Sequence, residues 1–518
     1  MNNKQLLIDT VEDLYDKYKG NDFVLDKLQY YITKYLPSQL SQEDIAQKDK
    51  IIKNELLTKA QTIFVQVFLQ QNLFYYLPGN GFFFEYDSKD YRIIKEDHII
   101  HMLLSSITKD KTIIEWKEKT KTIIHKKIKE RNLLDCKPES ETIQKIIKYI
   151  YPSIFETKNY AKFFLTLVGD VLLKKTQLIY LVSPQIKKMI IEIEDISNSC
   201  LGITNISSQF VTKYHENNSY DNYRLIKINQ SYSNSLWKET LKTIGLNFLC
   251  VACHYSKIHK SSELFIDSKL EDNLKQYTLF LKTQKEEKIV SDFCDNFISR
   301  SDTLQMSWKD CHFLWKEYLQ ENNLYNIIYS TTLKQILRNK YSFDEKTDMF
   351  IGVTSKFLPK QNDFLRFWDE SMRESLVNYF DDEIEVDEIC TFYKIWSKSN
   401  KENKSITEEN VINILKHFFP DLIILDDKYI VNISFTSWDK IKDINEILLE
   451  FIESYKKNID LTLLSFDDIY IFYEKQGCQQ NKPIVSKRYF EKYIAYKFTD
   501  IIVYEKFIPL DKLIISCN

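Results

Sequence analysis

Three matching segments in the C-terminal half of the chain decide the predicted fold. They are Asp310–Tyr318 (DCHFLWKEY), Glu388–Trp396 (EICTFYKIW) and Asp468–Gln476 (DIYIFYEKQ). Each segment opens with an acidic residue and continues with apolar and aromatic residues at helical spacing. Their aromatic residues Trp315, Tyr393 and Tyr473 lie 78 and 80 residues apart. Self-similarity at a fixed period indicates a tandem repeat.

The same order of features follows each of these segments. A hydroxyl residue suited to capping precedes a second amphipathic helix, and these residues are Ser330, Thr407 and Ser486. A β-type run comes next, at Met349–Leu358, Tyr429–Phe435 and Ile501–Ile508. Helix, turn, helix and β-ribbon within about 80 residues is the layout of a winged helix. Stacked helical repeats are the alternative, and the strand-like runs argue against them.

The N-terminal half has a mixed pattern. Residues 1–70 predict helices, with the polar stretch SQLSQEDIAQKDK separating two helical segments. Phe82–Ile94 predicts a β-hairpin and Leu178–Val182 a buried strand.

The predicted fold class is therefore α+β and mainly helical, with an N-terminal α/β region before three tandem winged-helix-like repeats. The predicted parts are a helical segment (1–70), an α/β domain (71–200), a mixed connecting domain (201–300) and repeats at 301–380, 381–460 and 461–518.

Composition excludes several classes of protein. The 518 residues are 44% hydrophobic and 28% charged, as in ordinary globular proteins, and no apolar run is long enough to cross a bilayer. The N-terminus lacks the pattern of a secretory signal, and nine scattered cysteines favour reduced thiols. We therefore expect an intracellular protein with no membrane partner. The visible excess of Lys, Ile and Asn indicates an A+T-rich genome.

Glycine is scarce, and this bears on catalysis. Only 8 glycines occur, and no G-x-x-x-x-G-K-[ST] loop is present to surround phosphates. The pair Gly79 and Gly81 lacks the third glycine of a dinucleotide loop. The histidines form no readable catalytic triad. The prediction is a protein that is not an enzyme and has no cofactor.

The third repeat carries the best candidates for binding nucleic acid. Basic and hydroxyl side chains surround its second helix, namely Lys482, Ser486, Lys487, Arg488 and Lys492. The second repeat opens the equivalent helix with Glu408 and Glu409, which favours a protein contact. The alternative for all three repeats is a protein-binding module with solvated charges. Nearby, Asp381, Asp382 and Glu383 are interpreted as part of a junction between repeats or a helix N-terminus.

A second basic stretch lies in WKEKTKTIIHKKIKER. Its aromatic and basic side chains could stack a base and follow a phosphate backbone; they are Trp116, Lys121, Lys126, Lys127 and Arg131. A solvated helix face is the alternative.

The segment FLCVACHYSKIHK places Cys250, Cys253, His254 and His259 within ten residues. Cys-x-x-Cys with nearby histidines suits zinc. The surrounding stretch is apolar and helical in pattern, so the alternative is that the cysteines are small buried side chains. We expect no metal here.

Leu464–Ile494, LSFDDIYIFYEKQGCQQNKPIVSKRYFEKYI, resembles the C-terminal winged-helix segment of primase-helicases of large DNA viruses, phages and plasmids. Gly81–Ile107 looks like the aromatic hairpin and helix that open the domain before their helicase. Ala161–Val182 is similar to the helix and strand that lead into their ATPase. At Ser183–Lys188, where that family has a glycine-rich loop, this chain reads SPQIKK. The resemblance implies a viral paralogue that kept the accessory domains and lost the motor, located in the host cytoplasm or a viral factory.

Three functions remain open at this point. The favoured one is a nucleic-acid-associated accessory factor of a large DNA virus, acting in replication or gene expression on DNA or RNA. The other is a scaffold that holds viral or host proteins in a transcription or translation-initiation complex. A zinc-dependent enzyme is the third and weakest alternative.

Overall fold

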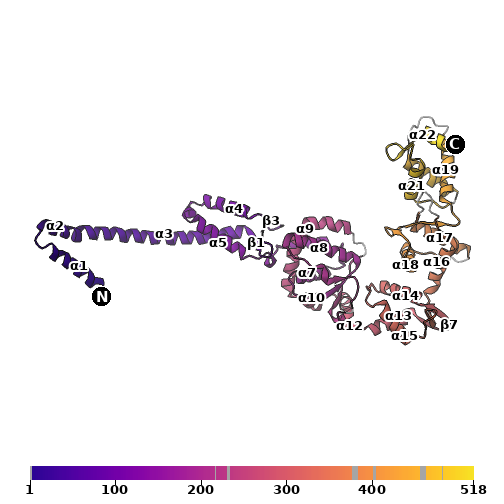
Figure 1. Ribbon diagram of the computed structural model, residues 1–518, viewed down its shortest axis with the longest axis horizontal. Coiled ribbons are helices and arrows are strands. Elements are labelled where there is room, and N and C mark those ends of the chain that lie inside the picture. The colour runs from indigo at the N-terminus through magenta and orange to yellow at the C-terminus, as the bar shows by residue number, and fades with distance from the viewer. Residues whose placement is uncertain are drawn as a thin grey trace. The chain divides into compact units, whose positions relative to one another are not determined.

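The computed structural model describes residues 3–215, 217–229, 234–375, 383–400, 404–455, 463–480 and 482–517. The chain forms two compact units, Met1–Gln284 and Lys285–Asn518 (Figure 1). Helices make up 65% of the structure and the sheets are small. The predicted class, α+β and mainly helical, is confirmed.

The first unit begins with long helices. They are α1 (Asn3–Lys17), α2 (Asp22–Tyr30), the π-helix η1 (Tyr31–Tyr35) and α3 (Leu36–Gln71). The polar stretch at residues 38–50 does not separate two helices, because it lies inside α3. That prediction was wrong because the stretch is rich in good helix formers and has no glycine or proline to end a helix. Pro37 sits in the first turn of α3, where proline is tolerated.

An antiparallel sheet follows α3. Its strands are β1 (Leu73–Leu77), β2 (Phe82–Tyr86) and β3 (Tyr91–Ile94), in the order β1-β2-β3. The predicted hairpin is confirmed, with Phe84 opposite Ile93. The helices that come after it are α4 (Glu96–Lys109), the 3₁₀ helix η2 (Lys111–Trp116) and α5 (Lys117–Lys129). Phe68, Phe74, Phe83 and Ile124 share one core with them, which fixes the end of α3 against α5.

The rest of the first unit surrounds a small parallel sheet, β5-β4-β6, formed by Phe210–Val211, Ile179–Leu181 and Tyr223–Leu225. Its α-helices are α6 (Ser140–Ile150), α7 (Lys158–Leu172), α8 (Pro184–Leu201), α9 (Asn234–His259), α10 (Ser262–Lys269), α11 (Asp272–Thr278) and α12 (Phe280–Thr283). Short 3₁₀ turns are η3 (Leu133–Asp135), η4 (Ser207–Gln209) and η5 (Tyr220–Asn222). Helices α7 and α9 touch at Gly169, where a Cβ would lie 2.1 Å from the Ala252 carbonyl oxygen.

The second unit repeats one order of elements three times: helix, strand, helix, helix, then returning strands. The first copy is α13 (Glu286–Phe297), β7 (Ser299–Ser307), α14 (Trp308–Glu321), α15 (Ser330–Lys340), β8 (Phe343–Asp344) and β9 (Met349–Thr354). The second is α16 (Leu358–Ser371), β11 (Glu383–Glu385), α17 (Val386–Ser399), α18 (Glu408–Phe418), β12 (Ile424–Leu425) and β13 (Tyr429–Val431). The third is α19 (Lys440–Tyr455), β15 (Leu463–Ser465), α20 (Phe466–Gln479), α21 (Lys487–Lys497) and β16 (Phe507–Pro509).

A few further elements join these copies. β10 (Met372–Glu374) pairs with β14 (Ile433–Phe435), and α22 (Leu510–Cys517) follows β16. In the first two copies the first strand pairs with the last one, in the orders β7-β9-β8 and β11-β13-β12. In the third copy β15 pairs with β16 in the same way.

Equivalent residues of the three copies occupy equivalent positions. The first and last strands pair through Met306 and Phe350, through Ile384 and Ile430, and through Leu464 and Ile508. All six side chains are buried. Trp315, Tyr393 and Tyr473 are buried in the helix that follows the first strand. The period seen in the sequence is therefore the period of a structural unit with one core design.

Capping also repeats. Ser307, Glu385 and Ser465 cap α14, α17 and α20, and each bonds the acidic residue three positions later. Of the predicted caps, Thr407 and Ser486 are confirmed, because their side chains accept from Asn410 N and Tyr489 N. The prediction for Ser330 was wrong, because that residue has already entered the helix and Tyr329 holds the cap position.

The predicted β-runs are shorter than expected. β9 ends at Thr354, and α16 begins at Leu358 with a proline in its first turn. Positive φ at Asn432 separates β13 from β14. Positive φ at Tyr504 and Glu505 forms a turn, so only Phe507–Pro509 of the third run is a strand.

Candidate functional site

The basic helix of the third repeat contacts the second repeat. Arg488 Nε lies 3.1 Å from Glu383 Oε1, and Lys492 Nζ lies 3.7 Å from Glu383 Oε2. The Arg488 guanidinium also lies 4.2 Å from the centre of the Tyr429 ring. Glu383 is only 2% exposed. Two of the predicted nucleic-acid residues are therefore joined to one buried carboxylate of β11.

A second buried carboxylate lies beside this contact. Glu388 Oε1 accepts from Ser486 N at 3.0 Å, and Glu388 Oε2 lies 2.6 Å from Lys440 Nζ. Burial raises the pKa of Glu388, while the Lys440 charge and the hydrogen bonds from Lys440, Glu385 N and Ser486 N oppose this rise. Lys440 Nζ also donates to the Glu383 carbonyl oxygen at 3.0 Å. Glu383 and Glu388 thus form the side of the contact that belongs to the second repeat.

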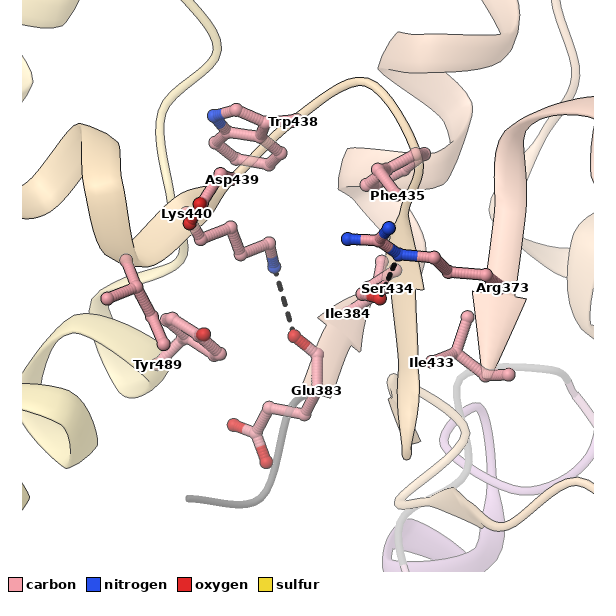
Figure 2. A pocket seen from close by; sticks show the side chains of 11 residues that line it. Arg373, Glu383, Ile384, Ile433, Ser434, Phe435, Trp438, Asp439, Lys440 and Tyr489 are labelled. Atoms are coloured by element: carbon pink, nitrogen blue, oxygen red, sulfur yellow. Dashed lines mark hydrogen bonds between the residues drawn. The ribbon is translucent and has the colours of Figure 1, made fainter. Parts of the chain in front are cut away.

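A pocket of about 110 Å³ opens beside these groups (Figure 2). Lys440, Trp438 and Tyr489 lie on one side of it, and Arg373 and Phe435 on the other. Arg373 Nε donates to Ser434 Oγ at 3.3 Å. At about 30 Å³ per molecule, the pocket has room for roughly three or four waters.

The remaining predicted lysines of the third repeat pair with acidic neighbours in that repeat. Lys482 Nζ lies 3.4 Å from both Asp443 Oδ1 and Glu446 Oε2. Lys487 pairs with Asp467 and, at 3.8 Å, with Glu491. The structure therefore brings Ser486, Arg488 and Lys492 to one contact, and it leaves Lys482 and Lys487 outside that contact.

The second repeat contacts the first one through the equivalent helix. In α18, Asn413 Nδ2 donates to Gln320 Oε1 of α14 at 3.0 Å. His417 Nε2 lies 2.8 Å from the Lys309 carbonyl oxygen, and its Nδ1 lies 3.0 Å from Lys316 Nζ. These partners assign the neutral tautomer with hydrogen on Nε2, since Nδ1 accepts from an ammonium group. Sequence reasoning missed this contact, because its partners are about 100 residues apart.

The contact at His417 predicts a loss of stability in acid. Burial lowers the pKa of His417 to about 4, and the charges of Lys316, His312 and Lys309 add to this effect. A histidine with a depressed folded-state pKa gives its full stability above about 6.5 and loses it as the pH falls toward 4. The His417 ring is only partly buried, so solvent weakens the effect of its pKa shift on stability. We therefore expect the free energy of unfolding to fall by about 1–2 kcal/mol, which is less than the full pKa shift would give.

The measurement is the free energy of unfolding at pH 7 and pH 4.5 for the native chain and for His417→Gln. Glutamine can accept and donate at this position without titrating. The native chain should lose about 1–2 kcal/mol more than the variant. Equal losses in the two proteins would contradict the role given to His417.

In the basic stretch of the first unit, some side chains contact other residues and others are exposed. The Lys119 amine lies 4.0 Å from the centre of the half-buried Trp116 ring. Lys121 pairs with Glu118 at 3.3 Å, and Arg131 Nη1 donates to the Leu69 carbonyl oxygen at 3.0 Å. Two residues remain, Lys126 and Lys127 of α5. They are exposed, and neither has an ion pair among the described residues.

The four predicted zinc ligands all belong to one helix, α9. Cys250 and Cys253 are buried in the core, and burial raises the pKa of Cys253 to about 12. A thiol with a raised pKa is a poor metal ligand, since zinc binds the thiolate. Within the described ranges of the chain, no group of three or more His, Cys, Asp or Glu side chains could hold a metal ion.

Residues 183–188 follow β4, where the resemblance to primase-helicases predicts a glycine-rich loop. In this chain Ser183 and Lys187 of that segment form hydrogen bonds with backbone groups instead. Ser183 Oγ accepts from Ile186 N and caps α8. Lys187 Nζ donates to the carbonyl oxygens of Ser207 and Phe210, at 2.5 Å and 2.8 Å. The lysine thus ties η4 and β5 to α8.

Comparisons with known proteins give no relative: no family model, no curated protein and no solved structure matches the chain. None of the helices searched in the described residues is long and apolar enough to span a membrane.

Proposed function

We propose that this chain is a non-catalytic scaffold whose C-terminal half consists of three tandem winged-helix modules that contact proteins. The order helix, strand, helix, helix and returning strands supports the winged-helix assignment. In winged helices that read DNA, the third helix enters the major groove. In this chain the third helices are α15, α18 and α21.

One observation carries the proposal. The polar and basic side chains of α18 and α21 contact the preceding repeat, through His417 on Lys309 and through Arg488 and Lys492 on Glu383. A phosphate backbone would have to compete with a buried carboxylate for the same two cations. We therefore infer that these contacts hold the three repeats rigidly together. The repeats would then bind protein partners within a transcription or translation-initiation complex.

Nucleic-acid binding is a second candidate function, and α5 favours it. Lys126 and Lys127 are exposed, and within the described residues neither forms an ion pair. Two exposed lysines on one helix end could contact successive phosphates. This site would suit an accessory factor in viral replication or gene expression, and kinship with primase-helicases of large DNA viruses stays a prediction.

A single binding series separates the two functions. The probes are fluorescent single-stranded DNA and RNA at low and moderate salt, with the native chain, Lys126→Glu/Lys127→Glu and Arg488→Glu/Lys492→Glu. We expect reversal on α21 to leave affinity unchanged. If α5 binds nucleic acid, its reversal weakens binding and reduces the salt slope by about 1.4, or ~0.7 for each lost phosphate contact.

The scaffold proposal fails on one outcome of this series. Tight, salt-dependent binding that is lost on reversal of Arg488 and Lys492, but kept on reversal of Lys126 and Lys127, would place nucleic acid on α21. Purification from the native source adds a direct check, since a scaffold should bring protein subunits with it.

A further inference from the structure

The helices that begin the chain hold an unusual share of exposed apolar surface. Of 38 exposed large apolar residues in the described part of the chain, 18 lie at or before Val67. α1, α2 and η1 contain no buried residue. A helix without tertiary packing is only marginally stable in water, so we expect a partner to cover part of this surface.

An open groove of about 480 Å³ lies between α1 and α2, and we call it the α1–α2 groove. Its apolar lining comes from Val11 and Tyr15 of α1, which are 41% and 52% exposed, and from Leu25, Leu28 and Ile32 of α2 and η1. The last three residues lie three and four positions apart and form a row along about 10 Å of helix. A groove with two helical walls and an apolar row of this kind fits the apolar face of a third helix.

A polar row runs beside the apolar one. Asp22, Asp26, Gln29 and Thr33 also line the α1–α2 groove, and they lie four, three and four positions apart. Both aspartates are exposed, and in the part of the chain that the structure describes neither side chain forms an ion pair. Residues 9–26 carry six acidic side chains and two lysines, so the potential around the groove is negative.

We propose that the α1–α2 groove binds a basic amphipathic helix of a partner protein. The partner's apolar side chains lie on Leu25, Leu28 and Ile32, and its lysines or arginines pair with Asp22 and Asp26. Charge complementarity selects this occupant, since a neutral or acidic helix makes the same apolar contacts but leaves both carboxylates without a cation. A row of about 10 Å requires about two turns of the partner helix, with apolar residues at i, i+3 or i+4, and i+7.

The test is the affinity of the full chain for a peptide probe, measured by fluorescence anisotropy. The probe is a helical peptide of about 18 residues with leucines on one face and lysines on the other, and the control peptide has glutamate in place of each lysine. We expect the lysine peptide to bind saturably in about 150 mM salt and the glutamate peptide not to bind.

Two pairs of substitutions locate the bound peptide. Asp22→Asn/Asp26→Asn should weaken its binding about fivefold, the usual scale for two exposed ion pairs. Asp9→Asn/Asp13→Asn is the matched control, because it removes the same charge at the same spacing and both residues lie about 160° around α1 from Val11. We expect this control to change the affinity by less than about twofold.

A second comparison tests the apolar row. Leu25→Ser should weaken binding of the lysine peptide about fivefold, whereas Phe23→Ser should leave it within about twofold of the native value. Phe23 is 69% exposed and is not part of the groove lining. None of the substituted residues is buried, and circular dichroism should confirm that every variant keeps its helices.

Three results would overturn the proposal. The first is a native chain that does not bind the lysine peptide at about 1 mM. The second is an affinity that Asp22→Asn/Asp26→Asn leaves unchanged, or that both aspartate pairs weaken equally. The third is a native dimer, seen by light scattering, that Leu25→Ser dissociates and the peptide does not, since that result would assign the groove to a second copy. The inference does not rest on the proposed role of the repeats, and nucleic-acid binding or its loss leaves it untouched.

Discussion

Replacing Lys440 by alanine should destabilise the second unit by about 3–5 kcal/mol, the usual cost of removing one partner of a buried ion pair. The Lys440 and Glu388 side chains are 6% and 7% exposed, and Nζ lies 2.6 Å from Oε2. Without Lys440, the Glu388 carboxylate keeps hydrogen bonds from Glu385 N and Ser486 N but loses its charge partner. The measurement is urea denaturation followed by tryptophan fluorescence, with Trp438 beside Lys440.

The destabilisation caused by Lys440→Ala should become smaller as the pH falls. Lys440 lowers a pKa that burial raises, so its removal leaves the pKa of Glu388 higher. The carboxyl group then protonates at a milder pH, and the destabilisation should shrink as the pH falls. Adding Glu388→Gln to Lys440→Ala should restore more than half of the loss at pH 7, since the amide oxygen still accepts hydrogen bonds. A double variant as unstable as Lys440→Ala would show that the ion pair is not the cause.

Replacing Glu383 by lysine should release α21 from the second repeat. The substitution brings a third cation next to Arg488 and Lys492 at a position that is 2% exposed. Loss of the carboxylate and the added repulsion should together cost about 3 kcal/mol or more, with some screening because Arg488 and Lys492 are partly exposed.

Glu491→Lys is the matched control for this reversal. It changes charge by the same amount and lies on α21 itself, yet its partner is Lys487 and not a residue of the second repeat. We expect less than about 1 kcal/mol for this control, because the pair is exposed. Equal effects of the two reversals would mean that the charge of α21 matters and its contact with Glu383 does not.

The repeat could be predicted from the sequence because each copy carries the same short pattern of aromatic residues. Aromatic residues at a period near 80 mark the buried positions Trp315, Tyr393 and Tyr473, and each lies eight residues after the end of the first strand of its copy. The helix that opens each copy was missed. α13, α16 and α19 lie before the matching segments, where the three sequences share no visible pattern.

The contacts between repeats could not be predicted, because they join residues far apart in the chain. Glu383 and Arg488 are 105 residues apart, and Lys309 and His417 are 108 apart. In the sequence, Glu383 belongs to an acidic run interpreted as a junction, and Asp381 and Asp382 of that run lie outside the described residues. The lysines and arginine of α21 have the composition of a nucleic-acid helix. Only their neighbours show that two of them bind a carboxylate.

In the helices of residues 3–67, the sequence predicts the secondary structure but not the burial of the side chains. Its helical periodicity predicts helices, and the same periodicity would place the apolar positions in a core. The structure leaves Ile45, Ile52 and Leu56 exposed instead. Sequence pattern identifies a face that must be covered, and it does not say which molecule covers it.

Hydrogen exchange of the α21 amides in the full-length protein tests the central claim most directly, with the native chain, Glu383→Lys and Glu491→Lys compared at pH 7. If the third helices hold the repeats together, protection in α21 falls at least tenfold in Glu383→Lys and stays near the native value in Glu491→Lys. Protection of α21 that is the same in Glu383→Lys as in the native chain would contradict the account.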